Sequence, residues 1–294
     1  MLVDSLDTPI LEKEAKELFD GLNDCSNFDY HADRKYLSSS VLKTVHKSLE
    51  LYHREYILGL KEPTSPQSQN NFDVGSLTHS YILEPHLVKE DYNFYFGMRK
   101  AGAEFEAFLK GLTNKTLPII SVNQHKVATD CYEAFKRRKE AVELISGGFS
   151  EQTICGTLHG VPIKTRYDYI NVEKGYIADV KTTGYSADVD TFKSTCETLM
   201  YPLSAALYCA MAEQYYGKKF DFYYIVLSKK DKTCEVFKTS KKTMNEGNAI
   251  VKATCEKFLT AKKSGNWIEK CLTNEQDCES INTSTASSYI IQEI

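Results

Sequence analysis

The spacing of apolar residues changes along the chain, from a helical period in the first half to mixed strand and helix signals in the second. Apolar residues three or four positions apart predict helices over residues 10–19, 41–56, 73–83 and 122–145. Ser38 or Ser39 is suited to cap the second of these helices at its N-terminus. Residues 23–27 are expected to form a loop, and so is the segment 62–71, which is rich in proline, serine and amides.

After the glycine pair at 147–148, the pattern of the chain becomes strand-like. Residues 150–183 predict strands with turns at Gly156, at His159-Gly160 and over residues 171–175. A helix over 199–215, a strand over 220–227 with a hairpin partner over 233–239, and a helix over 242–263 follow. The chain is then polar from Thr273 to the apolar residues 289–291. These elements predict one α/β domain with a helical N-terminal part.

Composition and charge narrow the class of protein. The chain has 294 residues, 42% of them hydrophobic, and a formal net charge of −4. This charge excludes a globally basic surface for coating nucleic acid but allows a local basic groove. We expect no membrane span, because no apolar run approaches about 20 residues. The acidic start does not resemble a secretory signal, and the nine scattered cysteines contain no C-x-x-C pair, so we expect a cytoplasmic protein with reduced thiols.

The candidate chemistry lies between residues 151 and 181, and its centre is the segment 161–185. Two strands joined by a short turn would form a hairpin that brings Asp168 close to Asp179. Asp179 and Lys181 are two positions apart and therefore point to the same face of their strand, whereas Val180 points to the other. The pattern places two carboxylates and one ammonium at one edge of a sheet.

Such a group is suited to metal-assisted hydrolysis of a phosphodiester. Mg²⁺ prefers oxygen ligands and retains several waters, so Asp168, Asp179, a backbone carbonyl such as that of Val180, and the substrate phosphate complete its coordination. Mn²⁺ is expected to substitute. Lys181 would orient the attacking water or neutralise the charge that develops on the phosphate. The alternative reading is an exposed strand with solvated charges.

Other candidate residues have two readings each. Glu151 is either an accessory carboxylate or a solvated residue at a strand start, and His79 is either a ligand or a packed core histidine. Ser38, Ser40 and Lys43 at a helix start would hold a terminal phosphate or only cap the helix. The basic run at residues 136–139 is a phosphate contact or a solvated helix face. Some of the 19 tyrosines would stack on unpaired bases, or all of them would serve only in packing.

These motifs resemble the RecE/exonuclease VIII group of the PD-(D/E)xK nuclease superfamily. The similarity covers residues 36 to 268 and follows one order along the chain. Its parts are Leu37-Ser38-Ser39-Ser40 with Leu42-Lys43, Ser48 and Tyr52; Gly75 to Pro85 with His79; Glu151, Gly160, Lys164-x-Arg166-x-Asp168 and Asp179-Val180-Lys181-Thr182-Thr183; Tyr201 and Tyr208; residues 220–226; and Gly247 and Trp267.

The resemblance implies a restriction-endonuclease-like core, a mixed central sheet flanked by helices. It places the exonuclease domain at residues 36–270, between an N-terminal extension over 1–35 and a polar tail over 271–294. It also implies that Asp168, Asp179 and His79 bind the metal, that Lys181 assists the water, and that Glu151 is an accessory carboxylate. The residues expected to contact DNA are Ser38, Ser40, Lys43, Arg166, Ser204 and Tyr208.

The activity implied is 5′-to-3′ resection of linear duplex DNA ends, with release of mononucleotides and a 3′ single strand. The implied partners are duplex ends, a RecT-like single-strand annealing protein and further copies of the chain in a ring. One position departs from the superfamily pattern Tyr-x-x-Gln-x-x-x-Tyr, because Ser204 occupies the position of the glutamine. The geometry around this helix is therefore expected to differ.

Two other functions stay open. One is an endonuclease, or a nuclease domain that serves a helicase; the lack of clustered cysteines argues against its iron–sulfur branch. The other is a non-catalytic accessory protein that binds DNA ends, which only Ser204 favours.

Overall fold

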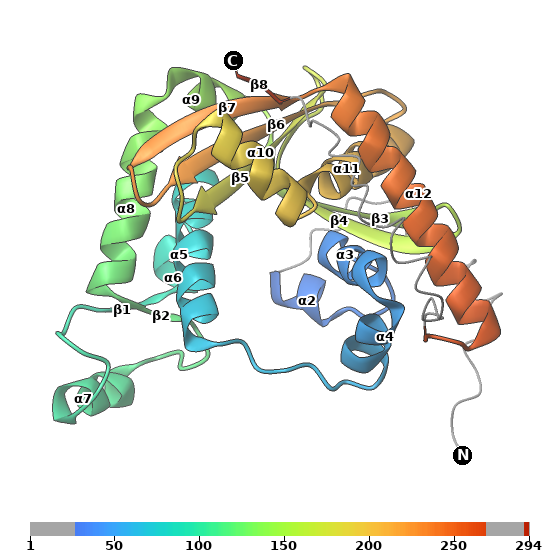
Figure 1. Cartoon of the computed structure of the whole chain (residues 1–294). Coiled ribbons are helices and arrows are strands. Elements are labelled where there is room, and N and C mark those ends of the chain that lie inside the picture. The colour runs from blue at the N-terminus through green and yellow to red at the C-terminus, as the bar shows by residue number, and fades with distance from the viewer. Residues whose placement is uncertain (1–26, 269–290, 294) are drawn as a thin grey trace.

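A six-stranded mixed sheet forms the centre of the part of the chain that the structure, a computed structural model, describes, namely residues 27–268 and 291–293 (Figure 1). The strands lie in chain order, and only β5 and β6 pair in parallel; the other neighbours are antiparallel. Their bounds are β3 Phe149–Leu158, β4 Val161–Asn171, β5 Tyr176–Thr183, β6 Asp221–Ser228, β7 Thr233–Thr239 and β8 Ile291–Glu293. The predicted mixed α/β fold is confirmed.

Both faces of the sheet are apolar, which explains why helices cover both. Along β6, Phe222 and Tyr224 pack into one core cluster, and Ile225 and Leu227 pack into another on the opposite face. A strand buried on both sides reads as a continuous apolar run, as residues 220–227 do. The alternation along β5 continues this division, so that Val180 is buried on one face and Asp179 lies on the other.

Two groups of helices cover these faces (Figure 1). Residues of α3, α10, α11 and α12 belong to the first cluster, and residues of α5, α8 and α9 belong to the second. The bounds are α3 Ser39–Lys47, α5 Pro66–Leu83, α8 Val122–Arg137, α9 Lys139–Leu144, α10 Val189–Thr198, α11 Tyr201–Tyr216 and α12 Lys241–Ser264. The active-site candidates come from both groups and from the sheet between them.

Smaller elements complete the described part. The chain begins with α2 Asn27–Ala32, and α3 is followed by α4 Leu49–Tyr52 and the π-helix η1 His53–Ile57. Between α5 and α8 lie α6 Val88–Asp91, α7 Ala103–Gly111 and the short parallel strands β1 Asn93–Tyr95 and β2 Ile119–Ser121. We refer to residues 92–121 as the arm. No part of the arm was predicted from the apolar pattern.

Several predicted elements require correction. Residues 66–71 are not a loop, because Ser65 caps a helix that has Pro66 in its first turn. The helix predicted over 122–145 is broken at Arg138, whose backbone is extended (φ −92°, ψ 99°) while its side chain pairs with Glu140 and Glu235. Gly156 is not a turn but a residue of β3, paired with Ile163.

Two further corrections concern helices. The helix predicted over 41–56 is divided into α3, α4 and η1, because Ser48 adopts an extended conformation and caps α4. Helix α10 was not predicted. The elements predicted at residues 10–19, the loop residues 23–26 and the tail over 273–290 lie outside the described residues, whereas Asn27 begins α2.

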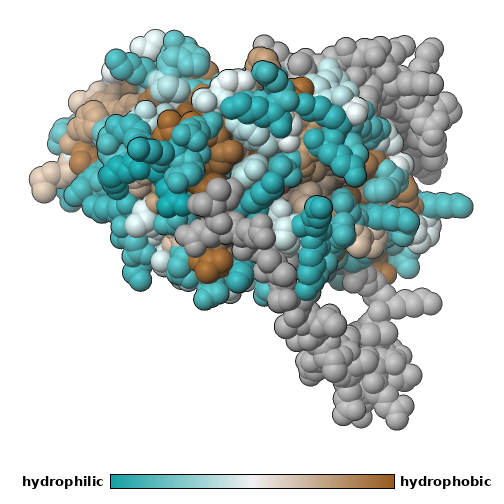
Figure 2. Space-filling model, turned by 90° about the horizontal axis from the view of Figure 1, so that it is seen from above, coloured by the Kyte–Doolittle hydropathy of each residue, from teal (hydrophilic) through white to brown (hydrophobic). Residues whose placement is uncertain are grey.

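The distribution of hydrophobic residues on the surface is consistent with a protein whose apolar residues are mostly buried. The face in Figure 2 is largely hydrophilic and carries separate small hydrophobic patches. Within the residues that the structure describes, no helix combines the length and the apolar character needed to cross a bilayer.

Candidate active site

The predicted hairpin is present, and its two strands separate where the acidic residues lie. Strands β4 and β5 pair from Asn171 and Tyr176 to Tyr169 and Ala178, and Asp168 and Asp179 follow next. The Asp168 carboxylate accepts a hydrogen bond of 2.7 Å from the Val180 backbone N–H. A side chain thus fills a position that a strand partner would take in a regular sheet. This bond fixes Asp168 at the fork between β4 and β5.

Three elements bring potential metal ligands to this fork. One donor atom each from His79 of α5, Glu151 of β3 and Asp168 of β4 lie within 4.8 Å of one another. His79 Nδ1 is 3.6 Å from an Asp168 carboxylate oxygen. Helix α5 approaches β5 closely at Gly75, where an added Cβ would lie 3.4 Å from Thr182 Oγ1. Two carboxylates and one imidazole around one point fit a divalent cation, and the donor set suits Mn²⁺ as well as Mg²⁺.

Glu151 is held in an unusual backbone conformation opposite Asp168. Its φ is +53°, in the left-handed region that costs a non-glycine residue energy. Arg166 Nε donates a hydrogen bond of 2.6 Å to the Glu151 carboxylate. Burial raises the pKa of Glu151, the neighbouring Asp168 adds to this, and Arg166 acts in the opposite direction. Arg166 therefore orients Glu151 and offsets the cost of placing two carboxylates side by side.

A first prediction follows from this ion pair. Replacing Arg166 with Met should weaken Mn²⁺ binding by about 10- to 100-fold, as loss of a residue that orients a ligand commonly does. Isothermal titration of the purified variant with MnCl₂ measures the effect, and Arg54→Met, at an exposed arginine on η1, is the control. Unchanged affinity in Arg166→Met would show that the Glu151 carboxylate is positioned without Arg166.

Asp179 and Lys181 form an ion pair beside this cluster. Both lie on β5, two positions apart, so their side chains share one face as predicted. Asp179 is only 6% exposed; burial raises its pKa against the opposing effect of Lys181. For Lys181, burial disfavours the charged form, but Asp179 and Asp168 outweigh it and raise the pKa. Lys181 is therefore a fixed ammonium at the edge of the ligand cluster.

A second lysine joins this group from α3. The ammonium of Lys43 is 5.2 Å from the centre of the Tyr201 ring, and that of Lys181 is 5.7 Å from it. Burial, with the charge of Lys181 as the next cause, lowers the pKa of Lys43 to about 8. Two ammonium groups thus share one aromatic ring next to Asp179. This arrangement creates a local positive site on an acidic protein, where an anionic group would be stabilised.

The remaining residues predicted to contact DNA have contacts within the protein. Ser204 accepts a hydrogen bond of 2.8 Å from Ser39, which links α11 to α3 at the position of the family glutamine. Ser38 and Ser40 bond to each other across 3.0 Å. Tyr208 packs against Tyr167, with ring centres 5.4 Å apart. The DNA contacts predicted for these residues and for Lys43 and Arg166 stay predictions.

Val180 and Tyr201 make contacts at the fork that the sequence did not indicate. The N–H of Val180 is taken by Asp168, and its carbonyl accepts a bond of 3.3 Å from Lys181. The proposed role of this carbonyl as a metal ligand stays a prediction. Tyr201 was noted only as part of a pattern, although its ring contacts both lysines. Its spacing to Tyr208 is the signal in the sequence, but the contact depends on how α11 crosses β5.

Comparisons with known proteins identify the family and the fold of the chain. Residues 38–282 match the model of a family described as a PDDEXK-like domain of unknown function (DUF3799). A crystal structure of a protein from Eubacterium rectale, described as a putative exonuclease, is similar in fold, with a TM-score of 0.62 and 17% identity. The similarity covers 88% of this chain and 94% of that one. No match is found among curated proteins. The chain belongs to the PDDEXK-like DUF3799 family and carries the PD-(D/E)xK fold.

Proposed function

We propose that the protein is a divalent-metal-dependent deoxyribonuclease that degrades linear duplex DNA from its ends. The observation that carries the proposal is the fork between β4 and β5. There the ligand cluster of His79, Glu151 and Asp168 lies beside the Asp179–Lys181 ion pair. Carboxylates and an imidazole that can hold a metal, with a cation beside them, suit metal-assisted hydrolysis of a phosphodiester.

Each residue has a role in this chemistry. When bound, a divalent cation would polarise a phosphoryl oxygen and lower the pKa of a nearby water. The His79, Glu151 and Asp168 side chains would hold the cation. Lys181, whose pKa is raised by Asp179 and Asp168, stabilises the added negative charge on phosphorus with its ammonium. Asp179, for which the role of metal ligand stays a prediction, lies outside that group of three and keeps the ammonium of Lys181 in place.

Lys43 extends the positive site toward the substrate. It lies beside Lys181 on the Tyr201 ring, so a phosphate at the fork would meet two ammonium groups. We propose that Lys43, with Ser38 and Ser40 in the same N-terminal region of α3, contacts a phosphate next to the scissile one. Charge-assisted bonds of this kind position a DNA strand without reading its sequence.

The family resemblance supports the finer parts of the proposal. These are 5′-to-3′ polarity, release of mononucleotides, a ring of several copies, and delivery of the 3′ strand to a single-strand annealing protein. The description of the Eubacterium rectale protein as an exonuclease is in keeping with action at ends. Mg²⁺ is the proposed metal, and the histidine in the cluster leads us to expect that Mn²⁺ supports the reaction as well.

One assay tests the proposed activity. Linear duplex DNA and the same DNA as a covalently closed circle are incubated with the full chain in Mg²⁺, in Mn²⁺ or in EDTA. We expect mononucleotides from the linear form only, with either metal, and none in EDTA. Cutting of closed circles would indicate an endonuclease, and binding to ends without cleavage would indicate an accessory protein; either result would overturn the proposal. Substrates labelled at one 5′ or one 3′ end give the polarity.

A further inference from the structure

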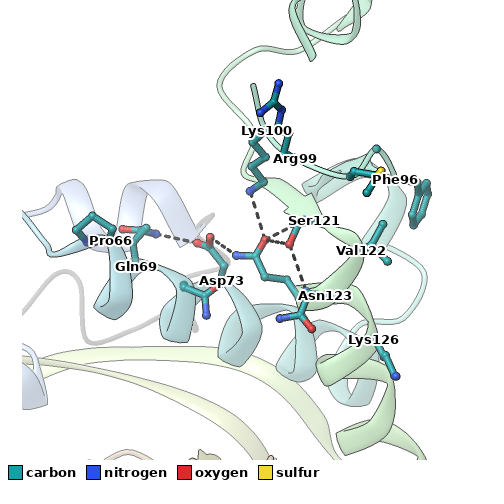
Figure 3. A pocket seen from close by; sticks show the side chains of 14 residues that line it. Pro66, Gln69, Asp73, Phe96, Arg99, Lys100, Ser121, Val122, Asn123 and Lys126 are labelled. Carbon is teal, nitrogen blue, oxygen red and sulfur yellow. Dashed lines mark hydrogen bonds between the residues drawn. The ribbon is translucent and has the colours of Figure 1, made fainter. Parts of the chain in front are cut away.

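A pocket with polar and apolar walls lies at the other end of α5. It has a volume of about 850 Å³ and is open to solvent. Its walls are the first turns of α5, the first turn of α8 and the segment 96–100 of the arm. Figure 3 shows Gln69 and Asp73 on the α5 side, Asn123 and Lys126 on the α8 side, and Lys100 reaching in from the arm. A pocket of this size accommodates a nucleotide.

A network of hydrogen bonds fixes the floor of this pocket. Asp73 accepts bonds from the side-chain amides of Gln69 (2.8 Å) and Gln124 (2.9 Å). Lys100 donates to the side-chain carbonyl oxygen of Gln124 (3.3 Å) and to the backbone carbonyl oxygen of Ile119. Gln124 is buried and also completes the capping box of α8. The polar groups are thus held in place before a ligand arrives, which reduces the entropy cost of binding.

The chemistry of the walls favours one class of ligand. Carboxamides pair with the edges of nucleobases, and here Asn70 and Asn123 supply them, whereas the buried amide of Gln124 is bonded within the floor. Arg99, Lys100 and Lys126 supply positive charge against the single carboxylate of Asp73. The apolar side chains of Phe96 and Met98 are 64% and fully exposed. Exposed aromatic surface beside cations is typical of sites for unpaired nucleotides, which stack one base and bind its phosphate.

The distance from this pocket to the fork is set by α5 itself. Asp73 and Gln69 precede His79 by six and ten residues, which corresponds to about 9 and 15 Å along the helix axis. The pocket therefore lies about 9 to 15 Å from the metal cluster along α5.

We propose that this pocket holds one unpaired nucleotide of a single DNA strand, about 9 to 15 Å along α5 from the proposed site of cleavage. The inference rests on the proposed function for the location of the cleavage site, but binding to the pocket does not require cleavage. A base must leave its stack to enter a pocket, so single-stranded DNA fits and intact duplex does not.

Binding measured in EDTA tests the pocket under conditions in which no DNA is cleaved. The full chain is titrated against fluorescein-labelled oligothymidylate and against a blunt duplex, and anisotropy gives the two affinities. Lys126→Glu and Phe96→Ala should each weaken binding of the single strand by about tenfold or more and change duplex binding by less than about twofold. Both side chains are exposed, so both variants should fold. The matched controls are Lys115→Glu, elsewhere on the arm, and Leu60→Ala, an exposed apolar residue.

A second readout gives the register. The adenine analogue 2-aminopurine, placed at successive positions of a single-stranded extension, should lose fluorescence on binding at one position, that of the nucleotide in the pocket, and Phe96→Ala should reverse this. Single-strand binding unaffected by both pocket variants, or lost equally with duplex binding, would overturn the inference. If the pocket variants behave as expected but the wild type cleaves no DNA, the proposed function fails and the pocket stands.

Discussion

Replacing Lys181 with Met should reduce nucleotide release from linear duplex DNA by about 10²- to 10³-fold. The reason is the raised pKa of this lysine, which lies between Asp179 and the Tyr201 ring and presents a permanent positive charge at the fork. Removing a preorganised charge that meets the transition state affects the rate of the chemical step more than substrate binding. The measurement is the rate at saturating DNA and metal, with DNA affinity measured separately in EDTA.

Two further variants complete this test. Lys252→Met removes an exposed lysine of α12 and should leave the rate unchanged. Because Lys181→Met leaves Asp179 buried without its partner, Lys181→Arg is included to keep the charge while changing its position and geometry. We expect Lys181→Arg to retain more stability than Lys181→Met but to remain well below the wild type in rate. A full rate in both variants would exclude Lys181 from the chemistry.

Replacing Gly247 with Ala should destabilise the protein by about 3 kcal/mol, at the upper end of the usual cost of overpacking. Gly247 lies where α12 crosses α11, and an added Cβ would lie 2.8 Å from the Ala206 Cβ and would also meet the carbonyl oxygen of Pro202. Backbone atoms of a packed helix cannot move aside at little cost. The expected decrease in melting temperature is about 6–12 °C, measured by differential scanning fluorimetry.

The matched control is a glycine with free space around it. Gly111 ends α7, and a Cβ added there would meet nothing within 4 Å. Gly111→Ala should leave the melting temperature unchanged or raise it slightly, because alanine reduces the freedom of the unfolded chain. Equal melting temperatures for Gly247→Ala and the wild type would contradict the close helix contact described here.

Elements with a strong local signal were predictable from the sequence. The strand β7 and the helix α12 agree with their predicted bounds to within one residue, because each has a continuous apolar pattern and clear flanking polar residues. The first turns of α5 were not predictable in this way. They are polar and exposed, and only the Ser65 cap and Pro66 distinguish them from a loop. Arg138 interrupts a helical pattern because its partner Glu235 lies on β7, far along the chain.

The candidate site shows the same difference between contacts with a local signal and contacts that depend on distant parts of the chain. Asp168, Asp179 and Lys181 lie within one hairpin, so strand period and one turn were enough to bring them together. The approach of His79 depends on how α5 packs against β5, about 100 residues later in the sequence, and no local pattern encodes such a contact. The Arg166–Glu151 pair depends on the register of β3 and β4, which the sequence analysis did not assign.

The most direct test of the proposed activity is the replacement of Asp168 with Asn. An asparagine oxygen still accepts the Val180 N–H, so the fork keeps its hydrogen bond while the ligand cluster loses one charge. Nucleotide release from uniformly labelled linear duplex is followed in Mg²⁺ and in Mn²⁺, with a thermal melt to confirm folding. We predict that Asp168→Asn folds as the wild type does, binds Mn²⁺ weakly and releases no nucleotide above the EDTA background. Release at the wild-type rate would contradict a metal-dependent nuclease site at this fork.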